Sequence, residues 1–236
     1  MKLLLTSNGL VNDSIQNALQ DLCDKPFNKS RFIFIPTAAN PEPNDKSWLA
    51  NDIKNAHSLG WKNFDIVDIA ALANLEKDAW WPRIEQADVI LVGGGNTFYL
   101  SYWMQKTGLF AALPELLEHK VYVGISAGSI IASRTLRSTS QAISKFGQLV
   151  DEDYELLGPK GQSSEEALKF IEFAIRPHYK SKFFPNLGEE GLNKLAASIE
   201  VPLYALDDHS ALQVVDGKID VISEGEWKLY ESSSKK

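Results

Sequence analysis

The chain has 236 residues, of which 44% are hydrophobic and 23% are charged, the balance of an ordinary globular protein with a sizeable core. Its formal net charge of -7 and the lack of a Lys/Arg-rich block argue against binding to nucleic acid. Its single cysteine, Cys23, excludes an intramolecular disulfide. The apolar start at residues 3–5 is too short for a signal peptide, and no apolar run approaches the roughly 20 residues of a membrane span. We therefore expect one cytoplasmic domain over residues 1–236, away from the membrane.

The first half of the chain alternates short apolar runs with amphipathic stretches. The apolar runs predict buried strands at residues 3–5, 32–35, 64–67, 89–92 and 121–123. Helical periodicity appears between them, at residues 12–24, 46–59, 70–85 and 97–119. This alternation predicts an α/β fold, in which a mainly parallel sheet is sandwiched by helices. Small or polar residues end these strands, and ligands of such sheets bind beyond the carboxyl ends.

The second half of the chain has a different character. Residues 134–165 are polar with scattered glycines and predict a long excursion, such as a lid or a substrate loop. Beyond it, a helix is predicted at residues 189–198, and strands at residues 170–175, 203–206, 211–215 and 218–222. The dipeptide Asp216-Gly217 between the last two strands predicts a two-residue turn, so the fold should include a C-terminal β-hairpin.

The most informative motif is Gly124-Ile125-Ser126-Ala127-Gly128, which follows the apolar run at residues 121–123 and precedes a predicted helix. A G-x-S-x-G sequence between a strand and a helix is typical of a nucleophile elbow, where small flanking residues let the chain turn sharply and expose the serine hydroxyl. The N–H of Ala127 would then lie at a helix N-terminus, where it can stabilise developing negative charge. The alternative is an ordinary tight connection with a capping serine.

A nucleophilic serine needs a base, and the chain has four histidines. His57 lies within a predicted helix and His119 at the end of one, so both are interpreted as structural. His178 follows the predicted strand at residues 170–175, and His209 follows the strand at residues 203–206. Position alone favours His178 over His209 without excluding either, and a hydrogen-bonded surface histidine is the alternative for both.

An acid that orients the base can come from Asp207 or Asp208, which also follow the strand at residues 203–206. The alternative for this pair is a turn, where Asp is common. The chain order serine, histidine, acid differs from that of α/β-hydrolases and argues against that fold. The glycine run Gly93-Gly94-Gly95 is neither a Walker A motif nor a dinucleotide fingerprint, but its turn can direct an N–H toward an oxyanion.

Three motifs together resemble the peptidase E (aspartyl dipeptidase) family of serine peptidases, to which cyanophycinase is related. They are Gly93-Gly94-Gly95-Asn96-Thr97-Phe98, Gly124-Ile125-Ser126-Ala127-Gly128 and Arg176-Pro177-His178. The resemblance spans nearly the whole chain and implies a fold like that of class I glutamine amidotransferases. It also implies that Ser126 is the nucleophile, that His178 is the base, and that the N–H groups of Gly95 and Ala127 form the oxyanion hole.

The chain departs from this family at two places. Aspartyl dipeptidases place an aspartate of the triad shortly after the elbow, where this chain has Gln141. Other family members draw the acid from the late strand end, which favours Asp208 here. Aspartyl dipeptidases also bind the substrate aspartate with an arginine after the histidine, whereas residues 188–192 of this chain contain no arginine. Aspartate specificity is therefore not predicted.

The sequence predicts a serine exopeptidase or dipeptidase that hydrolyses short peptides through an acyl-enzyme on Ser126. His178 relays the proton, and Asp208, ahead of Asp207 or Gln141, supports it. No cofactor is predicted, and no metal, because the chain has neither a His-Glu-x-x-His motif nor a cysteine pair. An amidase or esterase with a different acyl substrate and a non-catalytic ligand-binding protein are the alternatives. A homodimer is compatible with this prediction.

Overall fold

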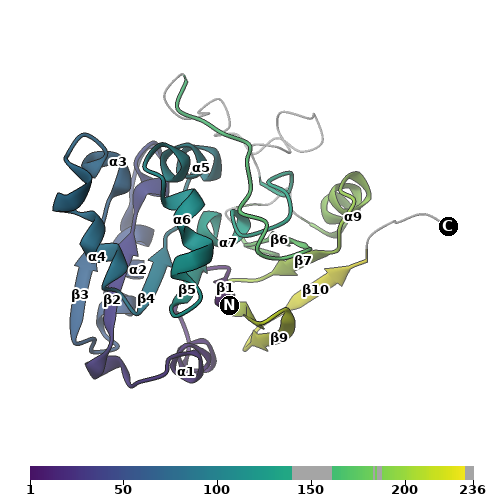
Figure 1. The fold of residues 1–236 in the computed structure, drawn as a ribbon. Coiled ribbons are helices and arrows are strands. Elements are labelled where there is room, and N and C mark those ends of the chain that lie inside the picture. Colours follow the sequence, from purple (N-terminus) through teal and green to yellow (C-terminus); the bar gives the residue numbers. More distant parts are fainter. Residues whose placement is uncertain (140–160, 183, 185–187, 232–236) are drawn as a thin grey trace.

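The computed structural model describes residues 1–139, 161–182, 184 and 188–231. Its centre is a seven-stranded sheet with the order β3-β2-β4-β5-β1-β8-β9 (Figure 1). Neighbouring strands are parallel from β3 to β1, and β8 and β9 are antiparallel additions. The strands are β1 (Lys2–Thr6), β2 (Arg31–Ile35), β3 (Asn63–Ile66), β4 (Val89–Val92), β5 (Val121–Ile125), β8 (Ser210–Val215) and β9 (Lys218–Ser223). The predicted mainly parallel α/β fold and its C-terminal hairpin are confirmed.

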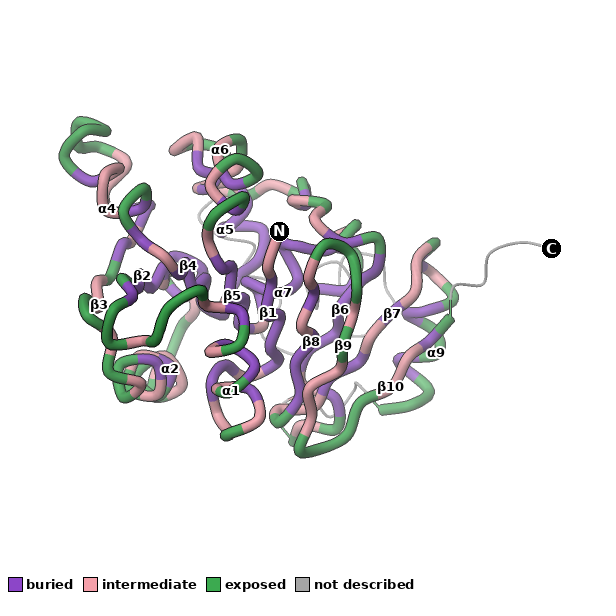
Figure 2. The backbone as a smooth tube through the Cα atoms, turned by 60° about the horizontal axis from the view of Figure 1, so that its bottom comes forward, coloured by how far each residue is buried: buried purple, intermediate pink, exposed green. Residues whose placement is uncertain are grey.

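Helices cover both faces of this sheet, because the central strands are apolar on both sides. Successive residues of β1 point to opposite faces, so that Leu3 and Leu5 join one core cluster and Leu4 the other. The cluster around Leu4 packs against α1 (Asp13–Leu22) and α2 (Ser47–His57). The cluster around Leu3 packs against α3 (Ile69–Leu72), α4 (Trp81–Glu85), α5 (Thr97–Lys106), α6 (Leu109–Leu116) and α7 (Ala127–Ile130). Figure 2 shows the resulting burial, with buried central strands inside a more exposed layer.

A second, three-stranded sheet has the order β10-β7-β6 and lies on the side of the molecule away from β3 (Figure 1). Its strands are β6 (Ala174–Arg176), β7 (Leu203–Leu206) and β10 (Trp227–Tyr230). The helix α9 (Glu189–Ser198) packs on it through a core cluster of its own. Three short 3-10 turns complete the described elements: η1 (Phe27–Lys29), η2 (Thr37–Ala39) and η3 (Lys77–Ala79).

Two predicted helices are interrupted. The stretch predicted at residues 97–119 divides into α5 and α6, because Gly108 adopts the left-handed conformation with φ 79° between them. The stretch predicted at residues 70–85 divides into α3, η3 and α4. Pro82 lies in the first turn of α4, where its missing N–H is tolerated, and it cannot continue a helix from upstream.

Two predicted strands also differ from expectation. The strand predicted at residues 170–175 begins only at Ala174, because the N–H groups of Phe170 and Ile171 donate to the carbonyl of Ala132 instead of to a strand. The strand β3 lies at the edge of the sheet and is only partly buried, so it is not covered on both faces. Most of the excursion predicted at residues 134–165 lies outside the described residues. No helix in the described ranges combines the length and the apolar character needed to cross a bilayer.

Candidate active site

Ser126 occupies the sharp turn between β5 and α7. Its φ of 47° and ψ of -104° are unusual for a residue with a side chain, and such conformations persist only where the surroundings impose them. Here the N–H of Ser126 donates to the carbonyl of Thr6 at 3.1 Å. Glycine is required on both sides of the turn: a Cβ at Gly124 would lie 2.6 Å from the backbone of Gly128, and one at Gly128 would lie 2.1 Å from the carbonyl oxygen of Val92. The motif therefore forms the predicted strand–turn–helix elbow.

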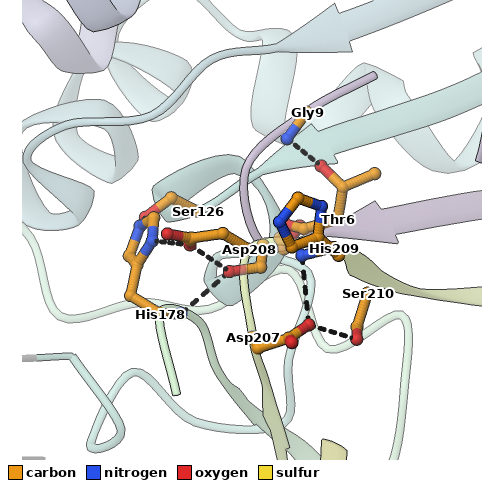
Figure 3. Close-up of polar contacts among 10 residues, drawn as sticks. Thr6, Gly9, Ser126, His178, Asp207, Asp208, His209 and Ser210 are labelled. Carbon is orange, nitrogen blue, oxygen red and sulfur yellow. Dashed lines mark hydrogen bonds and ion pairs between the residues drawn. The ribbon is translucent and has the colours of Figure 1, made fainter. Parts of the chain in front are cut away.

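His178 faces this serine from the loop that follows β6. Its Nε2 lies 3.0 Å from Ser126 Oγ (Figure 3). The backbone of His178 has a φ of 63°, and its N–H donates to Ser7 Oγ at 2.8 Å. The imidazole also stacks on the ring of Phe184, with centroids 5.0 Å apart and planes 17° apart. The ring is thus held by contacts with residues that are distant from it in sequence as well as near.

Asp208 lies on the other side of the imidazole, with Oδ1 2.6 Å from His178 Nδ1. Partial burial raises the pKa of this carboxyl, but hydrogen bonds from His178 and Ser7 and the charges of nearby histidines outweigh burial and lower the pKa below its usual value. The ionised carboxylate can only accept hydrogen bonds. His178 therefore donates Nδ1–H to Asp208, and its Nε2 is free to accept the hydroxyl proton of Ser126.

The other polar residues of this loop have different partners. Asp207 accepts hydrogen bonds from the backbone N–H of His209 at 3.0 Å and of Glu226 at 2.6 Å, and from the hydroxyl of Ser210 (Figure 3). It is a turn residue, as the alternative interpretation of the sequence expected. His209 is exposed, and the described contacts do not bring it to Ser126. Of the residues that the sequence left open, the structure brings His178 and Asp208 to the serine.

The glycine run that follows β4 lies beside the elbow. A Cβ at Gly94 would come within 3.4 Å of Ser126 Cβ. Gly95 has a φ of 125°, and a Cβ there would lie 2.2 Å from the carbonyl oxygen of Ala38, so only glycine fits. Ala127 is the first residue of α7, a position whose N–H has no acceptor within its own helix. Ala127 is therefore next to Ser126 in the chain, and Gly95 follows a residue that lies beside Ser126 in space.

Ser7 is a residue of this site that the sequence did not single out. It is fully buried just beyond β1, and its hydroxyl accepts the backbone N–H of His178 while donating to Asp208 Oδ1 at 3.3 Å. One side chain thus links the backbone of the histidine to the carboxylate. The only signal in the sequence is that polar residues end the first strand, on the edge where the other motifs also lie.

Other expectations for the site have mixed outcomes. Gln141, the alternative acid position, lies outside the described residues. The first turn of α9 carries Glu189 and Glu190, which pair with Lys228 and Lys194. Within the described ranges, no group of three or more His, Cys, Asp or Glu side chains is arranged to hold a metal ion.

An open polar cavity of about 440 Å³ lies at the opposite end of the sheet, where β2 and β3 begin. Arg83 on its wall is bound by Asp65 through two hydrogen bonds. The cavity is therefore separate from the site around Ser126. Its lining residues are Arg31, Ile33, Lys62, Asn63, Asp65, Arg83, Gln86 and Ala87.

The chain is similar to known proteins over nearly its whole length. The profile of peptidase family S51 matches residues 3–222. Peptidase E of Salmonella gallinarum is 26% identical over 228 residues, covering 92% of this chain and 86% of the relative. Peptidase E of Shewanella baltica is 27% identical over 235 residues, covering 96% of this chain and 89% of the relative.

Two solved structures share the fold. The crystal structure of a Listeria monocytogenes EGD-e protein named for peptidase E has a TM-score of 0.71 and 22% identity, covering 95% of this chain and 98% of that one. A peptidase from an acI-B1 Actinobacterium has a TM-score of 0.58 and 17% identity, covering 99% of this chain and 95% of that one. At these identities the structures establish the fold, and the family profile establishes the relationship. The chain belongs to peptidase family S51 and is a serine peptidase.

Proposed function

We propose that the protein is an exopeptidase or dipeptidase that hydrolyses short peptides through an acyl-enzyme on Ser126. The observation that carries this proposal is the continuous series of hydrogen bonds from Ser126 through His178 to Asp208. A nucleophile, a base and an orienting acid in this geometry are the elements of a serine hydrolase triad. The resemblance to aspartyl dipeptidases supports short peptides as the substrate class.

In this mechanism His178 Nε2 takes the hydroxyl proton as Ser126 Oγ attacks the carbonyl carbon of the substrate. The negative charge of Asp208 stabilises the imidazolium that forms. His178 then gives the proton to the leaving amine, and the C–N bond breaks to leave an ester on Ser126. A water molecule, deprotonated by the same histidine, hydrolyses this ester and restores the free hydroxyl.

The oxyanion of each tetrahedral intermediate needs donors that are already in place. We assign this role to the backbone N–H groups of Gly95 and Ala127, because Ala127 follows the nucleophile and Gly94, the neighbour of Gly95, lies beside Ser126. Backbone donors cannot be removed by substituting a side chain. Gly95→Ala would instead force the Ala38 segment to move and would misplace the donor.

The choice of side chain is expected to differ from that of aspartyl dipeptidases. The first turn of α9 carries Glu189 and Glu190, each paired with a lysine, and α9 has no arginine that could bind a substrate aspartate. We therefore propose that the enzyme does not require an aspartate side chain in its short peptide substrates.

The test is hydrolysis of a panel of dipeptides and tripeptides, including Asp-initiated ones, by the wild type and by Ser126→Ala. Cleavage that is lost in the variant, together with labelling of Ser126 by a serine-directed phosphonate, is the expected result. Labelling without cleavage of any peptide would replace this proposal with an amidase or esterase. A wild type that neither reacts with the phosphonate nor cleaves peptides would overturn catalysis by Ser126 altogether.

A further inference from the structure

Asp52 is a buried carboxylate that the mechanism above does not use. It lies in the middle of α2, and its side chain is part of a residue that is only 8% exposed. Asp52 is the one acidic residue among the buried residues that the structure describes. Among the residues that the structure describes, no hydrogen-bond donor or cation pairs with Asp52, and burial raises its pKa to about 7. Burying a charge without a partner is unfavourable for folding, so a carboxylate at this position suggests a functional role.

Two contacts place this part of α2 beside the nucleophile. The ring of Trp48, one helical turn before Asp52, would lie 3.9 Å from a Cβ at Gly94, and that same Cβ would lie 3.4 Å from Ser126 Cβ. Asp52 Oδ1 would lie 3.3 Å from a Cβ at Gly9, which would also touch the side chain of Ile125 at 3.0 Å. Ile125 directly precedes the nucleophile. Trp48 and Asp52 therefore lie along one face of α2, next to the elbow.

Gly9 has no side chain to cover the carboxylate of Asp52, which lies 3.3 Å from the position that a Cβ would take at this residue. This glycine has a φ of 81°, and its N–H is already bound by Thr6 Oγ1 at 2.9 Å. Most of the other polar side chains buried near the elbow have partners within the protein: Thr6 and Ser129 donate to backbone carbonyls, and Ser7 binds His178 and Asp208. Asp52 differs from these side chains because it has no hydrogen-bond partner among the described residues.

We propose that Asp52 binds the α-ammonium group of the peptide substrate and so restricts the enzyme to substrates with a free amino terminus. This rests on the proposed function, since an exopeptidase must recognise a chain end. An α-ammonium group carries one positive charge and up to three N–H donors, which is what an unpartnered carboxylate requires. Because Asp52 is largely buried, such a pair is stronger there than at the surface. The carboxylate would be fully ionised once the ammonium group is bound.

The first test compares a free dipeptide amide with its N-acetyl form as substrates of the wild type and of Asp52→Asn. For the free peptide we expect KM to rise roughly 30-fold or more in the variant, the effect of removing one partner from a buried charge pair. The N-acetyl peptide should be an equally poor substrate of both proteins. Asp45→Asn is the matched control, because it removes an exposed carboxylate just before the same helix and should leave both substrates unaffected.

A second test measures binding without hydrolysis. Isothermal titration calorimetry with glycinamide, a small primary ammonium compound, is carried out on Ser126→Ala with and without Asp52→Asn. Binding that is lost with Asp52 supports the proposal, and equal binding in both proteins overturns it. Asp52→Ala serves as the second variant if Asp52→Asn does not fold.

The two proposals fail in different ways. A wild type that cleaves peptides but hydrolyses free and N-acetyl forms equally well overturns the role of Asp52 and leaves the peptidase intact. A wild type that binds glycinamide through Asp52 but neither cleaves peptides nor reacts with a phosphonate overturns the peptidase and leaves the ammonium site.

Discussion

Two carboxylates lie in the part of the fold that carries the nucleophile, and their surroundings shift their pKa values in opposite directions. Asp208, on the side of the small sheet, accepts hydrogen bonds from His178 and Ser7, which outweigh its partial burial and lower its pKa. Asp52, on the side of α2, is more deeply buried and has no described partner, and its pKa is raised to about 7. Burial acts in the same direction on both, so donors decide which carboxylate is ionised in the free protein.

The two carboxylates thus differ in whether the folded chain itself supplies their hydrogen-bond donors. Asp208 has its partners in the folded chain, as an orienting residue must before the substrate arrives. Asp52 lacks only a donor that a substrate can bring. Changing each residue in turn tests the contrast, because the same Asp-to-Asn substitution should mainly lower kcat at Asp208 and should raise both KM and stability at Asp52.

The largest effect is expected for Asp208→Asn. An amide in this position can donate to Nδ1 and favour the imidazole tautomer that carries its proton on Nε2, so that Ser126 loses its acceptor. It also removes the charge that stabilises the imidazolium. A fall in kcat of about 10⁴-fold, with the fold and thermal stability largely retained, is expected from the same change in other Ser-His-Asp triads. Peptide kinetics and a thermal unfolding curve measure both quantities.

A fall below tenfold in that experiment would show that Asp208 does not orient the base. Asp207→Asn is the matched control. Asp207 binds backbone groups of the turn and Ser210, so this variant should lose stability more than activity.

On the other side, Asp52→Asn is expected to stabilise the protein, and increasingly so as pH rises. The pKa of Asp52 is about 7 in the folded protein against 3.8 in an unfolded chain. Near pH 4 the folded carboxyl keeps its proton and the substitution should have little effect. Between pH 4 and 7 the unfolded chain releases the proton while the folded protein holds it, so wild-type stability falls with rising pH.

Above pH 7 the full penalty is present, and we expect Asp52→Asn to raise the free energy of unfolding by about 2–4 kcal/mol. Urea denaturation of both proteins at pH 4.5, 6 and 8 measures the difference. A difference that is constant with pH would show that Asp52 is ionised in the folded protein without cost, which would remove the contrast with Asp208.

The core of the fold was predictable from the sequence because the information is local. Five apolar runs gave the parallel strands within about two residues, since buried strands need uninterrupted apolar residues. Helix breaks were harder to predict. Gly108 occurs within an otherwise helical pattern, and an isolated glycine is tolerated in many helices, so its left-handed conformation is decided by the packing of α5 and α6.

The site was predictable in part for the same reason. The elbow around Ser126 is built from residues that are neighbours in sequence, and the glycines among them predict the sharp turn. The partners of His178 are not local: Ser7 lies 171 residues before it and Asp208 lies 30 residues after it. His178 and His209 both follow strands, and nothing in the adjacent residues says which ring turns to the serine. The sequence did not predict that Asp52 is buried, because an Asp in an amphipathic helix is usually exposed.

The smallest of these effects on activity is expected for Ser7→Ala, which removes one donor from Asp208 and leaves the carboxylate in place. The same change leaves the N–H of His178 without its acceptor, in a loop where φ is 63°. Looser positioning of the base should lower kcat roughly 10- to 100-fold, while KM should change little because the described hydrogen bonds of Ser7 are with His178 and Asp208. Ser7→Thr keeps the hydroxyl and should recover most of the activity.

Ser101→Ala is the matched control for that experiment. Ser101 is also fully buried; its hydroxyl donates to the backbone carbonyl of Glu166 at 2.7 Å and accepts from the side-chain amide of Gln105 at 3.1 Å, so both variants lose two hydrogen bonds of one hydroxyl and about 1–3 kcal/mol of stability. Only Ser7→Ala should lower the rate at which a phosphonate labels Ser126. Equal labelling rates in the two variants would mean that the imidazole is held by Asp208 and Phe184 alone. The orienting role of Asp208 would then depend on a single hydrogen-bond donor, the Nδ1–H of His178.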